Sequence, residues 1–277
     1  MKINYLIDKE IKCRDYLLTF YYSKSKIYKL FLNKQISISD RIIKENDILY
    51  PGDNLTIDYD EKIDYTPEDK NLDILYEDDY FLIINKDKHV IIHDESNSLC
   101  NIVAAYYKKN NIDLNIRFAH RLDIDTTGVI IFVKCPLCLS YMDHFIETHD
   151  IRRTYICEVN GKLKNKKGTI NLPIGEDRHI ANKKRVSKTG KTAITHYEVL
   201  EENDKYSKLK VELETGRTHQ IRCHLSYIGH PLIGDILYGD NSKLANRCLL
   251  HSYKIAFNHP VLNKLIEIKA DLPTDFL

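Results

Sequence analysis

One stretch decides the fold of this chain: Phe118-Ala119-His120-Arg121-Leu122-Asp123-Ile124-Asp125-Thr126-Thr127-Gly128, followed directly by Val129-Ile130-Ile131-Phe132-Val133. The apolar second part predicts a strand that is buried on both faces inside a sheet. The first part is polar and rich in turn-forming residues, so it predicts a loop anchored on that strand. A loop held by a rigid strand is where proteins keep binding and catalytic groups in position.

Short apolar segments on both sides of this strand predict more strands than helices. We expect strands at 74–76, 81–85, 155–159, 193–200, 209–213, 253–257 and 265–268. Helices are expected at 137–147, where apolar residues recur every four positions, and at 218–228, which ends before Gly229. Interleaved strands with few helices predict an α+β domain with a mixed, largely antiparallel sheet.

A small separate domain is predicted before residue 60. Two short helices are expected at 13–22 and 26–33, followed by strands at 36–39 and 55–57. The acidic stretch around Pro67 lacks apolar periodicity, which indicates a linker. The expected organisation is a domain at 1–60, a linker at 61–72 and a second domain at 73–277.

The first of these domains resembles the alpha-L RNA-binding domain of some ribosomal proteins. Residues 23–57 carry the resemblance, and Leu49-Tyr50-Pro51-Gly52-Asp53-Asn54-Leu55 is its most specific part. The resemblance implies that Lys24, Lys26 and Lys29, on or just before the second helix, contact RNA phosphates. An unrelated small cap domain is the alternative that the residues leave open.

Charged residues are segregated along the chain although the net charge is only +1. Residues 22–44 hold six Lys and Arg against one Asp, and residues 152–191 hold twelve against three acidic residues. Between them, residues 60–79 hold nine acidic residues against two lysines. Two basic stretches fit a polyanion that touches two surfaces. Solvated faces that keep the protein soluble explain the same pattern equally well.

Membrane and secreted classes are disfavoured by the composition. No apolar run reaches the roughly 18–20 residues of a membrane helix, and the N-terminal residues lack the apolar core of a signal peptide. The seven cysteines are odd in number and scattered, as in reduced proteins. We expect a cytoplasmic protein without a membrane partner, and we expect it to act as a monomer.

Asp123 is the first candidate for chemistry. His120 and Arg121 precede it, so positive charge beside a partly buried carboxylate would favour the ionised form that a nucleophile requires. Judged from the residues alone, Asp123 or Asp125 can equally serve to cap a turn.

Arg217 is the second candidate, because Thr215-Gly216 turns out of a strand and Arg217 stands at the mouth of the next helix. An arginine there can bind a carboxylate through two hydrogen bonds, although a solvated arginine is the commoner outcome. Tyr155 begins a strand, where a tyrosine usually belongs to the core.

Metal and nucleotide sites have little support in the sequence. His219 and His224 are five residues apart, which does not place them on one helix face as in zinc helices. Cys135-Pro136-Leu137-Cys138 is a single CxxC pair, and buried structural thiols explain it better than zinc or redox chemistry. No glycine-rich phosphate loop is present. We expect neither a metal nor a cofactor.

Several ordered motifs resemble the RluA family of RNA pseudouridine synthases. The first is His120-Arg121-Leu122-Asp123 with Thr126-Thr127-Gly128, and the second is 213–225 followed by Gly229-His230-Pro231-Leu232-Ile233-Gly234-Asp235. The segments 247–251, 257–260 and 272–276 fit the C-terminal pattern of the family. The resemblance spans residues 73–276. One departure is Lys86-Asp87-Lys88-His89, where the family usually has Lys-Pro and a Gly, and it leaves the local turn open.

The resemblance implies an isomerase that converts uridine in structured RNA to pseudouridine without a cofactor. It implies that Asp123 is the catalytic carboxylate, that Tyr155 packs against the target base and that Arg217 pairs with Asp123. Arg121, next to His120, would fill the gap left by the flipped nucleotide. A basic loop, Lys183-Lys184-Arg185, would contact phosphates. Large-subunit ribosomal RNA is the favoured substrate and transfer RNA stays open, while a catalytically silent RNA-binding or ribosome-assembly factor is the rival interpretation.

Overall fold

The computed structural model describes residues 1–93 and 96–277. Its N-terminal part forms a small sheet of its own with the strand order β1-β6-β3-β4. The strands are β1 (Lys2–Leu6), β3 (Ile36–Ile38), β4 (Arg41–Ile42) and β6 (Asn54–Asp58), and β2 (Ile11–Lys12) pairs separately with β5 (Ile48–Leu49). Helices α1 (Cys13–Leu18) and α2 (Lys24–Leu32) accompany the sheet. We call residues 1–60 the N-terminal module.

A nine-stranded sheet forms the main body of the molecule, with the order β11-β14-β15-β10-β16-β9-β8-β7 and with β17 beside β16. Its strands are β7 (Ile74–Glu77), β8 (Phe81–Lys86), β9 (Thr127–Val133), β10 (Arg152–Asn160), β11 (Lys167–Asn171), β14 (Ile194–Glu202), β15 (Tyr206–Leu213), β16 (Leu250–Asn258) and β17 (Leu265–Lys269). All of its paired strands are antiparallel except β9 and β16. A separate hairpin joins β12 (Ile174–Glu176) to β13 (Lys184–Val186). The predicted α+β class with a mixed, largely antiparallel sheet is confirmed.

Strand β9 is the buried strand that the apolar run predicted, because all seven of its residues are buried. Gly128 explains how β9 approaches β16 so closely. It has φ +105°, and a Cβ there would lie 2.2 Å from the carbonyl oxygen of Ser252. Only glycine fits this position.

The helices of the main body are α3 (Leu99–Lys109), α4 (Pro136–Glu147) and α5 (Gln220–Tyr227), with a 3-10 turn at Ile236–Tyr238. Helices α4 and α5 lie where helices were expected. Helix α3 was not among the expected elements. A capping box between Ser98 and Asn101 begins it.

Two hydrophobic cores meet beneath the predicted loop. One core joins β8, β9, α3 and α4 to the N-terminal module, and the other joins β10, β15 and α5. Leu122 packs against both. The residue before Asp123 is therefore held between the two cores.

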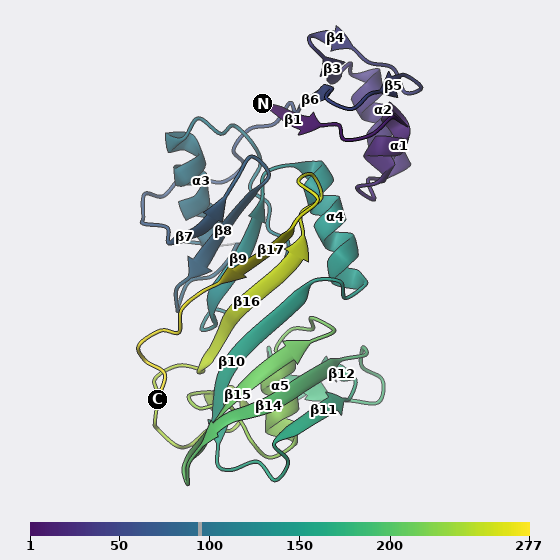
Figure 1. Cartoon of the computed structure of the whole chain (residues 1–277). Coiled ribbons are helices and arrows are strands. Elements are labelled where there is room, and N and C mark those ends of the chain that lie inside the picture. Colours follow the sequence, from purple (N-terminus) through teal and green to yellow (C-terminus); the bar gives the residue numbers. More distant parts are fainter. Residues whose placement is uncertain (94–95) are drawn as a thin grey trace.

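The N-terminal module lies at one end of the molecule, and β11, β14 and β15 lie at the other (Figure 1). The module contacts the main body directly: the Tyr80 hydroxyl donates to the carbonyl oxygen of Asn4, and the ring of Tyr21 stacks on His144 of α4 with 3.6 Å between centroids. No helix or strand lies between the end of β6 and the start of β7.

Candidate active site

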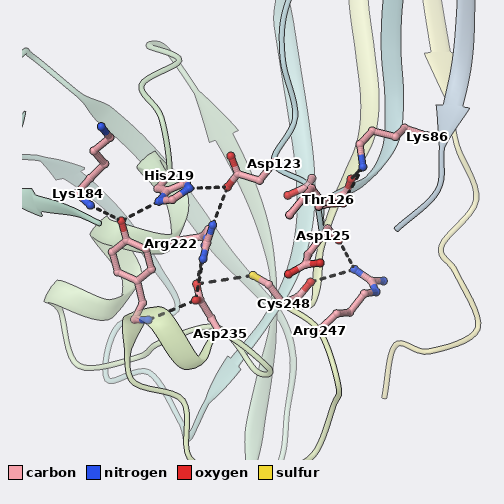
Figure 2. A network of polar contacts seen from close by, with 12 residues as sticks. Lys86, Asp123, Asp125, Thr126, Lys184, His219, Arg222, Asp235, Arg247 and Cys248 are labelled. Carbon is pink, nitrogen blue, oxygen red and sulfur yellow. Dashed lines mark hydrogen bonds and ion pairs between the residues drawn. The ribbon is translucent and has the colours of Figure 1, made fainter. Parts of the chain in front are cut away.

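The loop that carries Asp123 is fixed by two buried cations. Lys86, at the end of β8, is 1% exposed, and its Nζ donates to the carbonyl oxygens of Asp87, Ile124 and Thr126, each at 2.9 Å. Burial lowers the pKa of Lys86 to about 8, although the nearby carboxylates oppose this shift. Arg247 Nη1 donates to the carbonyl oxygen of Asp125 at 3.0 Å. The backbone of the loop is thus held from both sides (Figure 2).

The departure from the family pattern at 86–89 has a structural counterpart in this region. His89 takes a left-handed conformation with φ +58°, a backbone geometry that glycine adopts most easily. Its Nδ1 lies 2.9 Å from Oδ1 of Asp125. The side chain of Asp125 is therefore turned toward His89.

Arg222 is the cation that holds the Asp123 carboxylate. Its Nη1 donates to Oδ2 of Asp123 at 3.0 Å, while Nε and Nη2 donate to the two carboxylate oxygens of Asp235 at 2.7 and 2.9 Å (Figure 2). Burial alone would lower the pKa of Arg222, but the hydrogen bonds and charge of Asp235 outweigh it and raise that pKa. The guanidinium also lies over the Tyr238 ring, 5.1 Å from its centroid.

The expected pairing of Arg217 with Asp123 is wrong. Arg217 is exposed and its Nε donates to the carbonyl oxygen of Thr192 at 3.0 Å. Helix α5 begins at Gln220, so Arg217 precedes it and points elsewhere, whereas Arg222 lies in the first turn and faces the loop. The sequence placed two arginines five positions apart, and nothing in their spacing tells which one reaches the carboxylate.

His219 is the other neighbour of Asp123. Its Nε2 lies 3.8 Å from Oδ2 of Asp123, and its Nδ1 lies 3.2 Å from the hydroxyl of Tyr238, which accepts the backbone N–H of Lys184. Burial lowers the pKa of His219, although Asp123 opposes this shift. The ring is therefore neutral at pH 7, and Arg222 is the cationic partner.

Asp123 stands in the wall of a cavity of about 580 Å³. Asp123 and Tyr155 also line a smaller adjoining pocket of about 60 Å³. Tyr155 is 6% exposed, and burial raises its pKa. The expected site residues His120, Arg121 and Arg217 line the larger cavity as well. The structure thus brings five of the predicted residues together.

The predicted basic loop lies at the edge of this region, with Lys184 and Arg185 in β13. Lys184 pairs with Glu176, and Lys183 lies over the Tyr238 ring. The ring contact of Lys183 and the backbone N–H of Lys184, which donates to the Tyr238 hydroxyl, connect the loop to the residues around Asp123.

In the described part of the chain, no group of three or more His, Cys, Asp or Glu side chains is arranged to hold a metal ion. His224 is buried, and its two ring nitrogens lie 2.9 Å from Thr195 Oγ1 and from the carbonyl oxygen of Leu172. All seven cysteines are buried, and none of them forms a disulfide in the described part of the chain. Among residues 1–93 and 96–277, no helix is both long and apolar enough to cross a membrane.

The family described as RNA pseudouridylate synthase matches residues 80–227, which include the loop, Tyr155 and Arg222. The chain belongs to the RNA pseudouridine synthase family. It is an isomerase that converts uridine in RNA to pseudouridine. The resemblance to this family is confirmed, and the rival interpretation as a silent RNA-binding factor finds no support.

Similar pseudouridine synthases cover almost the whole chain. An uncharacterized RNA pseudouridine synthase, YhcT, of Bacillus subtilis is 42% identical over 91% of this chain and 86% of the relative. Ribosomal large subunit pseudouridine synthase D of Salmonella typhimurium is 31% identical over 92% of this chain and 85% of the relative. The solved structure of Human RNA Pseudouridylate Synthase Domain Containing 1 aligns with a TM-score of 0.63 and 26% identity, over 75% of this chain and 85% of that one.

Proposed function

We propose that this pseudouridine synthase modifies uridines of large-subunit ribosomal RNA in the cytoplasm, with Asp123 as its catalytic carboxylate. The position of Asp123 carries the proposal, since it is the one carboxylate in the wall of both the cavity and the adjoining pocket among the described residues. Its relative from Salmonella typhimurium is named for the large ribosomal subunit, which supports the choice of substrate.

The reaction breaks the bond between N1 of uracil and C1′ of the sugar and forms a bond between C5 and C1′. The proton on C5 is lost and N1 gains one, so the composition does not change. Asp123 either attacks C1′ or the uracil ring, or acts as a base. In each route the ion pair with Arg222 fixes where the carboxylate oxygen meets the substrate.

The target uridine leaves its stack to reach Asp123, at a cost of roughly a few kcal/mol. Tyr155 packs against the flipped base inside the pocket. The exposed Arg121 occupies the gap that the flipped uridine leaves in the RNA. Arg217 contacts RNA at the rim of the cavity, because Arg217 lines both the cavity and the adjoining pocket without binding Asp123. Contacts to phosphates from Lys183, Lys184 and Arg185 offset the cost of flipping.

The N-terminal module, residues 1–60, binds RNA as an alpha-L domain. Residues 61–72 link this module to the catalytic domain at 73–277. The protein acts as a monomer. The exposed lysines Lys24, Lys26 and Lys29 of α2 support an RNA-binding role.

Mapping pseudouridine across cellular RNA, with and without this protein, tests the proposal. We expect loss of pseudouridine at one or a few positions of large-subunit ribosomal RNA, restored by the wild-type gene and not by Asp123→Asn. Loss confined to transfer RNA would overturn the choice of substrate.

A further inference from the structure

Arg153 is a buried cation in the wall of the large cavity that the proposed mechanism does not use. It is 6% exposed, and its Nε and Nη2 are buried without a hydrogen-bond partner in the part of the chain that the structure describes. A guanidinium carries a permanent charge, and leaving such a group buried and unpaired is costly. A buried guanidinium without hydrogen-bond partners can bind a group that the substrate brings into the cavity.

Among residues 1–93 and 96–277, the cavity wall around Arg153 holds no carboxylate other than Asp123. His120 lines the same cavity, and in this described part of the chain no hydrogen bond is found to its two buried ring nitrogens. Burial, together with the charge of Arg153, lowers the pKa of His120 to about 3, so this ring is neutral. Asp123 is the one carboxylate among the described residues that line the cavity, and it is held by Arg222.

Strand β10 places Arg153 beside the catalytic group but not on it. Arg153 and Tyr155 are two positions apart on one strand, so their side chains share a face of the sheet. Tyr155 and Asp123 line both the cavity and the small pocket, whereas Arg153 and His120 line only the cavity. A nucleotide whose base enters the pocket would therefore extend its sugar and phosphate toward Arg153.

Gly216 leaves the room that the guanidinium occupies. A Cβ at Gly216 would lie 2.7 Å from Nη1 of Arg153, closer than any carbon can stay. Because the clashing atom is the end of a flexible side chain, alanine at 216 would displace the guanidinium at little cost to the fold.

We propose that Arg153 binds a phosphate of the RNA backbone next to the flipped uridine. The inference rests on the proposed function of the site. A phosphate fits this position better than an uncharged base oxygen, because it matches the planar donors of arginine with two oxygens and neutralises the buried charge.

The test uses the full chain and an RNA stem-loop that spans the uridine found by mapping. Copies of this RNA carry one uncharged methylphosphonate at the linkage before or after that uridine. For wild-type protein, one of the two replacements should weaken binding about tenfold or more. For Arg153→Ala, native RNA should bind about as weakly, and the same replacement should cause no further loss. The slope of log K against log salt should fall by about 1.

Two further variants make the result specific. Arg152→Ala removes the exposed neighbour on the opposite face of the strand, and it should keep the full sensitivity to the methylphosphonate. Gly216→Ala should lose the sensitivity of RNA binding to the methylphosphonate, as Arg153→Ala does, although Arg153 is still present. The proposal would be overturned if each methylphosphonate weakened RNA binding equally in wild-type protein, in Arg153→Ala and in Gly216→Ala.

A different role for Arg153 would give a different result. If it recognised a uracil oxygen, Arg153→Ala would lose the preference for uridine over cytidine at the target and keep the salt slope, which would also overturn the proposal. Absence of tritium release by wild-type protein from RNA labelled at C5 would instead refute the proposed function, while the binding comparison would still decide the role of Arg153.

Discussion

At the scale of the residue, Asp123 depends on neighbours that come from distant parts of the chain. Leu122 holds its backbone between two cores, Lys86 binds the carbonyl oxygens that follow it, and Arg222 binds its carboxylate. Asp123 itself, Arg222 and Lys86 each lead to a separate prediction about the activity.

Asp123→Asn should abolish isomerisation and leave RNA affinity nearly unchanged. Asparagine keeps the size of the side chain, but its amide is a poor nucleophile and base, and phosphate contacts supply most of the affinity. Tritium release from C5-labelled uridine, run beside a binding titration, measures both. Asp125→Asn is the matched control and should stay active, because Asp125 faces His89. Normal tritium release by Asp123→Asn would refute its assignment.

Arg222→Gln should lower kcat roughly 10²-fold, because the carboxylate of Asp123 loses the group that orients it. Arg217→Gln should raise KM more than it lowers kcat, since Arg217 lines the cavity without touching Asp123. Steady-state kinetics of the two variants would separate these roles. A larger loss of kcat in Arg217→Gln than in Arg222→Gln would indicate that Arg217, and not Arg222, pairs with Asp123 when RNA is bound.

Activity should fall as the pH rises through about 8, where Lys86 loses its proton. The ammonium group has three donors for three carbonyl oxygens, and the neutral amine has only two. Stability should not fall over this range: the pKa is lowered in the folded state, so above pH 8 the unfolded chain binds more protons and the folded state gains stability. The kcat–pH profile and thermal melts of the same samples test this. Lys86→Met should be less active, without an inflection near pH 8. An inflection that persists in the variant would assign it to another group.

At the scale of the element, the contact between β9 and β16 sets the position of the loop. Both strands are buried where they meet, at Gly128 and Ser252. Close approach of two backbones requires a residue without a side chain.

Gly128→Ala should destabilise the protein by about 2–5 kcal/mol, because alanine adds an unfavourable positive φ and a clash with the Ser252 carbonyl. Gly52→Ala is the matched control: its φ is +92° but no atom lies within 4 Å, so it should cost only about 1–2 kcal/mol. Urea unfolding of the two variants gives the difference. Equal losses would mean that β9 and β16 can separate without cost.

The sequence predicted those elements whose apolar pattern lies within the element itself. The buried strand β9 and helix α4 were predicted because their apolar patterns are local. Helix α3 was missed because the short, nearly continuous apolar run within it is compatible with a buried strand as well as with a helix. The site residues Asp123 and Tyr155 were named from the family resemblance. Lys86 and Arg222 were missed as site residues because their partners in the Asp123 loop lie 38 or more positions away, a distance that pattern analysis of one sequence does not bridge.

At the scale of the whole molecule, the N-terminal module and the main body share one hydrophobic core. In the proposed function, the exposed lysines on α2 of the module and the basic residues near β13 form two surfaces that bind RNA. A substrate that touches both surfaces would depend on salt more steeply than one that touches only the cavity.

Replacing Lys24, Lys26 and Lys29 together by alanine should reduce the salt slope of RNA binding by about 2–3 and leave kcat at saturating RNA unchanged. The lysines are exposed on α2, so the fold should persist. A salt titration of RNA affinity measures the slope, and single-turnover rates measure the chemistry. The triple replacement Lys9, Lys12 and Lys44 to alanine is a control of equal charge on the same module. If the salt slope of RNA affinity were unchanged after replacement of Lys24, Lys26 and Lys29, the RNA-binding role of α2 would be refuted.

The parallel pairing of β9 with β16 also determines when the enzyme can first work during its own synthesis. Thr127 bonds to His251, which follows it by 124 positions. At about 5–20 residues per second, a ribosome needs roughly 6–25 s to make the intervening chain. Throughout this interval, residues 127 and 128 of β9 lack the strand that pairs with them, whereas residues 131–133 of the same edge are already bonded to residues 117–119. We expect the chain to acquire activity only after β16 has been released from the ribosome.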